Sequence, residues 1–456
     1  MFASISIERE ACPIRLLDAA GLDVWLESAD AFQRQWLETN RFKARPGQYL
    51  VVPGDDGNPQ VVLVGYEQQP DLWTLAGLPA RLNGGLYQID AAAEFGHGVR
   101  EKLALGWAFG HYQFDRYKPS EWPNCQLILD DALRQRVEIL RDASFRVRDW
   151  VNTPACDLGP AELAEIANEL AERNQADFTV IEGEQLEKEF PAIHAVGQAA
   201  SRAPRLVCVK WGDKNHPPLA LVGKGVIFDS GGLNIKPGAG MVLMKKDMGG
   251  AAHVLGLAEL IMRFKLPVHL RVYIPAVENA IAGNAYRPSD IVTTRNGTTV
   301  EIGNTDAEGR VVLSDALTLA SEEGAERIID FATLTGAARI ALGEDLPPLY
   351  ARDDQIARAI QDLSFELDDP LWHMPLYEPY RKQIQPKIAD LSNTGTSNFG
   401  GSLTAALFLD HFVDDEIDWL HLDVYAWNVG HRPGRPAGGE AQGIRAMYAW
   451  LESQYR

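Results

Sequence analysis

Cysteine is scarce in this sequence, and its spacing argues against two kinds of site. The 456 residues include four cysteines, and none of them belongs to a CxxC or CxH pair. They are Cys12, Cys125, Cys156 and Cys208. Zinc ribbons and disulfide frameworks need paired cysteines, so neither is indicated, and a reducing cytoplasm fits best. Without a partnered histidine motif there is also no case for a thiol protease.

Long apolar runs and a positive net charge are lacking as well. No stretch of about 18 apolar residues occurs, and the opening residues MFASISIEREACP do not join a basic segment to an apolar run. We therefore expect neither export nor membrane insertion. The formal net charge is -20, which repels phosphate backbones at long range. Nucleic acid is accordingly not expected as a partner.

The composition is that of a large folded protein. Apolar residues make up 46% of the chain and charged residues 23%, close to ordinary globular usage. A chain of 456 residues exceeds the usual size of one core, so we expect two domains. Residues 1–129 predict a smaller N-terminal α/β domain. Residues 130–153 predict a connecting helix and linker, and residues 154–456 a large catalytic domain.

Strands and helices alternate along the large domain. The segments 205–212, 219–228, 269–277, 298–303 and 327–334 have the pattern of strands, whereas 160–173, 249–264 and 310–324 have helical periodicity. Such alternation predicts a mainly parallel sheet with helices on both faces. In sheets of this kind ligands bind beyond the carboxyl ends of the strands.

Four carboxylates stand at the predicted junctions between strands and helices. Asp229 ends the strand 219–228, Asp247 precedes a helix, and Asp306 and Glu308 follow the strand 298–303. If residues 306–308 are extended, Asp306 and Glu308 project from one face. Carboxylates crowded in one crevice cannot all stay ionised without compensating cations. The pattern therefore predicts a pair of divalent metal ions, the usual device for activating a bridging water.

Two lysines support this interpretation. Lys224 lies between two glycines inside the predicted buried strand 219–228, where a charged ammonium needs a partner. A neutral amine bound to a metal is one solution, because a nearby dication and burial both lower the pKa of lysine. Lys236 lies in the glycine-rich loop after Asp229, where it could stabilise a developing oxyanion.

Four sequence blocks carry a resemblance to a known family. They are VGKGVIFDSGGLNIKP, MKKDMGGAAHV, NTDAEGR and ATLTGA. In order and spacing they resemble the signature motifs of the leucyl aminopeptidase family, the cytosolic two-metal exopeptidases of the M17 type. The similarity spans roughly residues 150 to 456, with DLSNTG, FGGSLTAALFL and WLHLDVYAWN as weaker blocks. A lone DxE would mean almost nothing, but four ordered blocks are specific.

The resemblance implies a role for each matching residue. The metal ligands would be Lys224, Asp229, Asp247, Asp306 and Glu308. Lys236 would stabilise the gem-diolate, and Arg310 would hold a bicarbonate ion that acts as general base. Two divalent metal ions per subunit are implied. Zinc and manganese are expected before magnesium and cobalt, although the ligand set alone does not choose among the four metals. The implied protein is a cytoplasmic homohexamer that removes N-terminal amino acids from peptides with a free N-terminus.

The resemblance also implies a substrate cleft. Met244, Thr333, Leu334 and Gly336 match family positions that line it, and apolar first residues would fit such a wall. The sequence departs from common family patterns at Gly249, where cysteine is frequent, and at His253. Neither position is a metal ligand.

Ordinary structural roles are the alternatives for the individual residues. Asp306 alone is read more simply as a helix cap, Arg310 as the partner of a neighbouring acid and Lys236 as an exposed loop lysine. His253, on an apolar helix face, is more simply a structural histidine than a ligand. Two rival functions are a two-metal phosphatase or nuclease, for which no GxxxxGK[ST] element is present, and a DNA-binding role.

Overall fold

The computed structural model describes all residues except 6–9, 91–93 and 122–123. Its chain divides into two compact units. The first comprises Met1–Asp142 and Val429–Ala437, and the second comprises Ala143–Asn428 and Gly438–Arg456. The helix α4 (Asp131–Asn152) begins in the first unit and ends in the second. The first unit therefore includes a short segment from near the C-terminus, which the sequence pattern did not indicate.

The first unit is built on a six-stranded sheet in the order β1-β6-β5-β2-β4-β3. Its strands are β1 (Phe2–Ser4), β2 (Cys12–Leu17), β3 (Tyr49–Pro53), β4 (Pro59–Gly65), β5 (Gly85–Ile89) and β6 (Cys125–Leu129). Only β3 runs antiparallel to its neighbour in the described part of this sheet. The helices are α1 (Ala19–Ser28), α2 (Ala31–Thr39) and α3 (His97–Phe109). The expected small α/β domain is thus confirmed.

The second unit is built on a nine-stranded mixed sheet. Its strands are β7 (Asp177–Glu182), β8 (Arg205–Trp211), β9 (Pro218–Gly223), β10 (Gly225–Asp229), β11 (His269–Asn279), β14 (Arg327–Ala332), β15 (Pro348–Ala351), β16 (Trp372–His373) and β18 (Asp418–Asp423). The central strands β18, β14, β9, β11 and β10 are parallel to their neighbours in this group. They are mostly apolar, as expected for strands buried on both faces, but the buried residues Asp330 in β14 and His421 in β18 interrupt the apolar runs.

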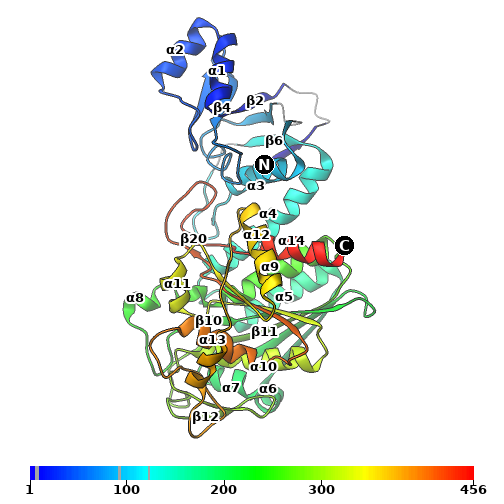
Figure 1. The fold of residues 1–456 in the computed structure, drawn as a ribbon, viewed down its shortest axis with the longest axis vertical. Coiled ribbons are helices and arrows are strands. Elements are labelled where there is room, and N and C mark those ends of the chain that lie inside the picture. Colours follow the sequence, from blue (N-terminus) through cyan, green and yellow to red (C-terminus); the bar gives the residue numbers. More distant parts are fainter. Residues whose placement is uncertain (6–9, 91–93, 122–123) are drawn as a thin grey trace. The chain divides into compact units, whose positions relative to one another are not determined.

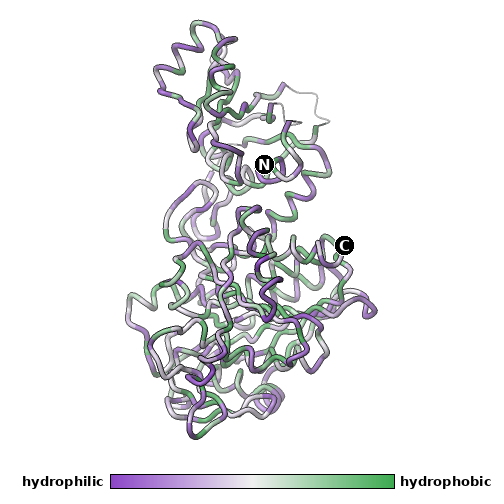
Figure 2. Tube along the Cα trace, viewed as in Figure 1, coloured by the Kyte–Doolittle hydropathy of each residue, from purple (hydrophilic) through white to green (hydrophobic). Residues whose placement is uncertain are grey.

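Helices cover both faces of this sheet. They are α5 (Pro160–Asn174), α6 (Gly183–Glu189), α7 (Pro191–Gly197), α9 (Gly249–Arg263), α10 (Glu308–Glu322), α12 (Asp354–Glu366), α13 (Gly401–Asp410) and α14 (Ile444–Tyr455). In Figure 1, α5, α9, α12 and α14 lie on one side of the sheet, and α7, α10 and α13 lie on the other. Figure 2 shows hydrophobic residues along the packed strands and helices and hydrophilic ones on the outer turns. The predicted helix-covered, mainly parallel sheet is confirmed.

Two details of the strand prediction are wrong. The segment 219–228 is not one strand, because β9 ends at Gly223 and β10 begins at Gly225. Lys224 lies at the break, where its backbone N–H donates to Phe331 O at 3.0 Å. The second error concerns residues 298–303, where β13 (Thr299–Glu301) belongs to a separate sheet with β12 (Ile291–Thr293) and β17 (Leu391–Ser392).

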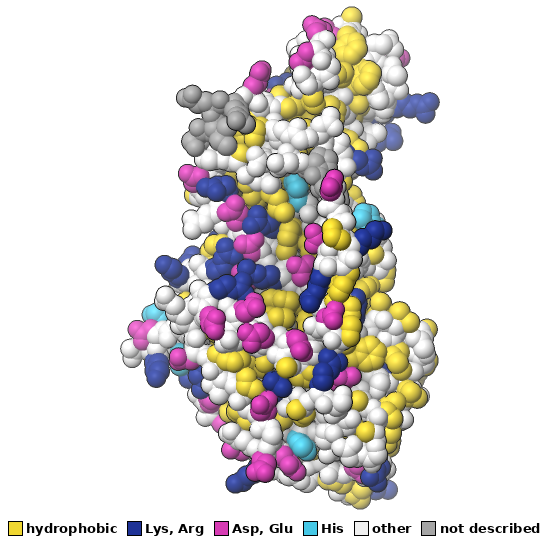
Figure 3. Space-filling view, turned by 180° about the vertical axis from the view of Figure 1, so that it is seen from behind, with side chains coloured by type: hydrophobic (Ala, Val, Ile, Leu, Met, Phe, Trp, Pro, Cys, Tyr) yellow, Lys and Arg dark blue, Asp and Glu magenta, His cyan; other side chains and the backbone are white. Residues whose placement is uncertain are grey.

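Charges of both signs are mixed on one face of the molecule. On the face drawn in Figure 3, lysine and arginine side chains are interspersed with aspartate and glutamate. This face does not present the uniform basic stripe that a nucleic-acid groove requires. Among the described residues, no helix combines the length and the apolar character needed to cross a lipid bilayer.

Candidate metal centre and substrate cavity

The site lies where the central parallel strands end. Lys224 follows β9, Asp229 is the last residue of β10, Asn279 ends β11 and Asp423 ends β18. The register places Asp229 beside Asn279 and Ala332 beside Asp423. Since these strands are parallel, their carboxyl ends meet at one edge of the sheet, which is where ligands are expected in such folds.

Three of the predicted carboxylates converge closely. Asp229, Asp306 and Glu308 each offer an oxygen, and these oxygens all lie within 4.8 Å of one another. The expected extended conformation of residues 306–308 is wrong, because Asp306 lies in a turn and Glu308 begins α10. The turn still brings both side chains to one place. The N-cap of α10 is Ala307, which makes no side-chain cap bond, so Asp306 is not a helix cap here.

Lys224 joins the fourth carboxylate to this cluster. Its ammonium lies 2.7 Å from Asp247 Oδ2 and 2.9 Å from Glu308 Oε1, and it donates to Thr333 O at 3.0 Å. The side chain is 3% exposed. Gly309 admits it, because a β-carbon at position 309 would lie 2.6 Å from Lys224 Cε. The five residues predicted as metal ligands therefore occupy one connected cluster.

Lys236 lies on the other side of the carboxylates. Its ammonium is 2.8 Å from Asp229 Oδ2 and 2.5 Å from Asp306 Oδ1, and its side chain is 15% exposed. The alternative of an exposed loop lysine does not describe it. The loop is held in place by Thr305, whose hydroxyl donates to Gly231 O at 2.6 Å and accepts the Asn234 N–H at 2.8 Å.

Burial and charge shift the pKa values of these groups. Burial, together with the charge of Asp247, raises the pKa of Asp229 to about 6 despite Lys236 and Lys224. Burial also raises the pKa of Glu308 well above its usual value. For Lys224, burial favours the neutral amine, but Asp247 and Glu308 outweigh it and raise the pKa. The four carboxylates of this cluster therefore carry more negative charge than the ammonium groups of Lys224 and Lys236 neutralise.

The donor set fits divalent cations. Glu308 Oε2 is buried without a hydrogen-bond partner among the described residues, a costly arrangement that a cation would relieve. The available donors are carboxylate oxygens and one amine nitrogen, and these suit zinc, manganese, magnesium or cobalt.

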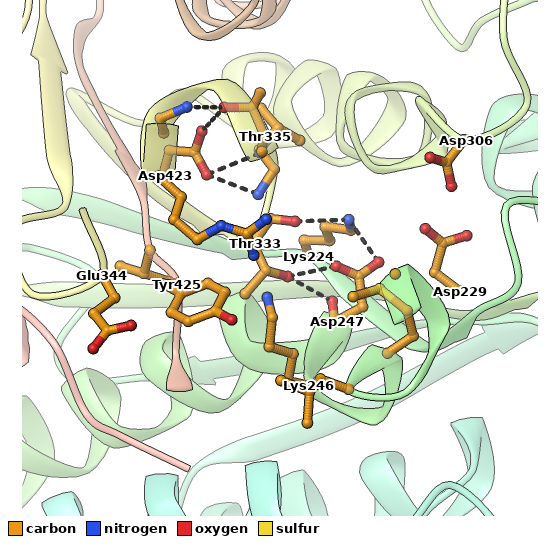
Figure 4. Close-up of a pocket in the computed structure, with 18 of the residues that line it drawn as sticks. Lys224, Asp229, Lys246, Asp247, Asp306, Thr333, Thr335, Glu344, Asp423 and Tyr425 are labelled. Carbon is orange, nitrogen blue, oxygen red and sulfur yellow. Dashed lines mark hydrogen bonds and ion pairs between the residues drawn. The ribbon is translucent and has the colours of Figure 1, made fainter. Parts of the chain in front are cut away.

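A cavity of about 340 Å³ opens beside the carboxylates. Lys224, Asp229, Lys236, Asp247 and Asp306 line it at one end, together with the predicted wall residues Met244, Thr333, Leu334 and Gly336. Figure 4 shows Asp229 and Asp306 on one side of this space and Tyr425 and Glu344 on the other. Four of the five predicted ligands, all but Glu308, therefore line the same cavity as the predicted substrate wall.

Arg310 does not line this cavity, although it follows Glu308 on α10. Its side chain is buried, and its Nε atom has no hydrogen-bond partner among the described residues. Burial lowers the pKa of Arg310 to about 10, although Glu308 and Asp423 favour the charged form. Among the described residues no ion pair joins Arg310 to a neighbouring acid. A small anion would therefore accept hydrogen bonds from its guanidinium and balance its charge.

Two supporting residues escaped the sequence prediction. Asn279 Nδ2 donates to Asp229 Oδ1 at 2.7 Å and to Thr305 O at 3.0 Å. Asp423 accepts the N–H groups of Leu334 and Thr335 at 2.8 and 3.1 Å. Both residues end parallel strands, and that position was the signal that could have found them.

The two departures from the family pattern have packing explanations. A β-carbon on Gly249 would lie 2.6 Å from Ala426 Cβ and 2.8 Å from Thr333 Cγ2, so this chain leaves no space for cysteine there. His253 is fully buried and uses both ring nitrogens, Nδ1 with Gly249 O at 2.6 Å and Nε2 with the Gln442 N–H at 2.9 Å. It is the structural histidine that we expected.

Comparison with known proteins gives a consistent result over the whole chain. Residues 145–448 match the model of the cytosol aminopeptidase family catalytic domain, and residues 12–130 match that of the M17 aminopeptidase N-terminal domain. A probable cytosol aminopeptidase of Syntrophotalea carbinolica is 41% identical over 372 residues, which cover 77% of this chain and 74% of the relative.

Solved structures give the same result. The crystal structure of the cytosol aminopeptidase from Coxiella burnetii superposes with a TM-score of 0.97 at 47% identity, covering 100% of this chain and 99% of that one. The bottromycin maturation enzyme BotP in complex with Mn superposes with a TM-score of 0.87 at 31% identity, covering 98% of this chain and 99% of BotP.

Proposed function

The chain belongs to the cytosol aminopeptidase family, and we propose that it removes N-terminal amino acids from peptides with two divalent metal ions at the carboxylate cluster. The observation that carries this proposal is the convergence of Asp229, Asp306 and Glu308 within 4.8 Å, with Lys224 bridging to Asp247. Without bound cations, burying these carboxylates together would be unfavourable, because their negative charges repel one another.

The proposed ligands divide into two sets. Lys224, Asp229, Asp247 and Glu308 would hold the tighter ion, and Asp306 would hold the second, with Asp229 and Glu308 shared. When bound, the ions supply Lewis acidity for the scissile carbonyl and lower the pKa of an attacking water. Manganese is supported by the BotP complex, and zinc, magnesium and cobalt suit the same donors.

Lys236 is proposed to stabilise the negative charge that develops on the carbonyl oxygen. Its ammonium faces the cavity beside Asp229 and Asp306, so a peptide carbonyl near these carboxylates comes within its reach. A fixed ammonium aimed at that oxygen acts without reorganisation during the reaction.

Arg310 is proposed to hold a bicarbonate ion as general base. A buried guanidinium whose Nε atom lacks a partner among the described residues suits a planar anion that it can bind in two places. The bound anion would accept the proton released when water attacks the peptide.

The substrate's free amino group is proposed to bind near Asp247, with the first side chain against Met244, Thr333, Leu334 and Gly336. With a metal ion held beside Asp247, the free amino group would bind to that ion as a neutral amine, which a continuing chain does not offer, so the protein would trim one residue at a time rather than cut internally. A homohexamer and a cytoplasmic location are proposed from the family resemblance.

Metal replacement tests this function. Protein stripped with chelator and reloaded with Mn²⁺, Zn²⁺, Mg²⁺ or Co²⁺ is assayed with amino acid anilides, N-acetylated anilides and phosphate esters. We expect at least one metal to restore release from free-amino anilides alone. Lys236→Ala should lower kcat by about 10² to 10³ with metal content kept, whereas Asp247→Ala should lose metal as well. Hydrolysis of phosphate esters in place of anilides would contradict the proposal.

A further inference from the structure

The substrate cavity has a charged end that the metal centre does not use. Lys246 belongs to a 3-10 helix over Met244–Met248, lines the cavity and is 6% exposed. Figure 4 shows its side chain rising between Tyr425 and Asp247 toward Thr333. Thr333 belongs to the wall proposed for the first side chain of the substrate, so the ammonium of Lys246 faces that space.

This ammonium has no counter-charge in contact with it. Among the described residues no carboxylate or carbonyl pairs with Lys246 Nζ, which lies over the Tyr425 ring at 4.6 Å from the centroid. Lys224 is buried to a similar degree but contacts two carboxylates and a carbonyl. A buried cation without an anion is expensive, and a cation–π contact offsets that cost only in part. The cavity thus offers a positive charge that an incoming anion would neutralise.

Charges of both signs surround Lys246, and Asp247, its neighbour in the sequence, attracts its ammonium most strongly without forming an ion pair with it. Arg339 also lines the cavity, and its guanidinium lies 5.0 Å from the centroid of the same Tyr425 ring. Asp423 faces the cavity but is already used, since it accepts hydrogen bonds from Leu334 and from the N–H and hydroxyl of Thr335. Glu344, which is half-buried, also lines the cavity, in addition to the proposed metal ligands Asp229, Asp247 and Asp306.

We propose that the enzyme selects peptides whose first residue is aspartate or glutamate, and that Lys246 is the residue that determines this selectivity. The inference rests on the proposed aminopeptidase function and specifies its substrate class. The side-chain carboxylate of the first residue binds the Lys246 ammonium, and Arg339 adds a second attraction. The methylene carbons of that side chain lie against Met244 and Leu334, so the apolar wall is used as well.

An uncharged first residue is disfavoured for a physical reason. Leucine would fill the same space and leave the buried ammonium without water or an anion, and unpaired polar groups of this kind discriminate strongly between substrates. A basic first residue would meet Glu344 but would be repelled by Lys246 and Arg339.

Substrate competition tests this inference on the metal-loaded protein. The kcat/KM values are measured for p-nitroanilides of glutamate, aspartate, glutamine, leucine and lysine. We expect glutamate or aspartate to exceed glutamine and leucine by about tenfold or more. Lys246→Met should lower the ratio of glutamate to leucine by about tenfold or more, and Lys246→Arg should keep most of it. Lys214→Met, which removes an exposed lysine in the turn after β8, is the matched control and should leave the ratio unchanged.

Each contrary result has a distinct meaning. Leucine preferred over glutamate by wild type, with a ratio that Lys246→Met does not change, overturns the selectivity and leaves the aminopeptidase function standing. Lysine as the best substrate overturns it in favour of Glu344. Release from none of the five anilides, with metal bound and the fold intact by circular dichroism, overturns the aminopeptidase function and the selectivity together.

Discussion

Gly309 and Lys224 are packed so closely that no side chain fits at position 309. A β-carbon there would lie 2.6 Å from Lys224 Cε and 2.7 Å from its Nζ, both well inside van der Waals contact. Lys224 cannot move aside without losing Asp247 and Glu308, which hold its ammonium. Even a methyl group at position 309, near the start of α10, would therefore push against the side chain of Lys224 and disturb the carboxylate cluster.

The first prediction is that Gly309→Ala damages metal binding. Overpacking should cost about 1 to 3 kcal/mol of stability and displace the Lys224 amine, so bound metal should fall together with activity. Metal content after gel filtration and the unfolding midpoint in urea measure the two effects. Gly98→Ala on α3, where a β-carbon meets nothing within 4 Å, is the control and should be neutral or stabilising. Full metal content in Gly309→Ala would count against the packing argument.

The second prediction concerns Asn279, which orients a proposed ligand. Asn279→Ala removes the amide that donates to Asp229 Oδ1 and Thr305 O. Loss of such a supporting contact typically weakens metal affinity by about 10- to 100-fold. Competition with a coloured chelator measures the affinity. Asn284→Ala, which removes an exposed amide bonded to Gln198 O, should leave the affinity unchanged, and equal affinities for the two variants would refute the role of Asn279.

The positions of the proposed ligands in the fold were predictable from the sequence because strand ends are local features. Apolar runs predicted the strands, and Asp229 was found at the end of one of them. Asp247 and Glu308 were found because they precede predicted helices. The break at Lys224 was not predictable, since it depends on strand pairing: β9 pairs with β14 and β11, whereas beyond Lys224 the described part of the sheet pairs β10 with β11 alone. Asn279 was missed because an amide at a strand end shows its partner only when the register with Asp229 is known.

The conformation of residues 306–308 illustrates the same limit. Alternation along an extended chain was the reason for placing Asp306 and Glu308 on one face, yet the chain turns there and α10 begins at Glu308. The turn depends on distant groups, including Asn393, whose amide donates to Asn304 O at 2.7 Å. The two side chains do converge, although the local geometry expected for them was wrong.

The third prediction is that Asp423 shapes the substrate wall rather than the metal site. Asp423→Ala frees the N–H groups of Leu334 and Thr335, so the wall should loosen and kcat/KM should fall by about tenfold or more, while metal content stays near that of wild type. Steady-state kinetics and metal analysis on the same sample separate these effects. Asp418→Ala, at the other end of β18 and paired with Arg327, is the control on the same strand. A loss of metal in Asp423→Ala would assign the residue to the metal site instead.

The fourth prediction is a pH dependence of stability that comes from His253. Burial lowers the pKa of His253 to about 4, and the ring is held neutral between Gly249 O and the Gln442 N–H. In the unfolded chain a histidine has a pKa of about 6.5. As the pH falls below about 6.5, the unfolded state binds a proton that the folded state refuses, so stability falls until the folded ring titrates near pH 4.

His253→Gln isolates this contribution, because all other titrating groups are common to both proteins. Wild type should lose about 2 kcal/mol more stability than the variant between pH 7.5 and pH 5.0, since the two pKa values differ by about 2.5 units. Urea unfolding at both pH values, at one fixed metal concentration, measures the gap. The variant should be the less stable protein at pH 7.5, because a flexible amide replaces a ring stacked on Phe331 at 5.6 Å. A gap that stays constant or widens as the pH falls would mean that His253 is protonated in the folded protein, and its two hydrogen bonds would then need a different assignment.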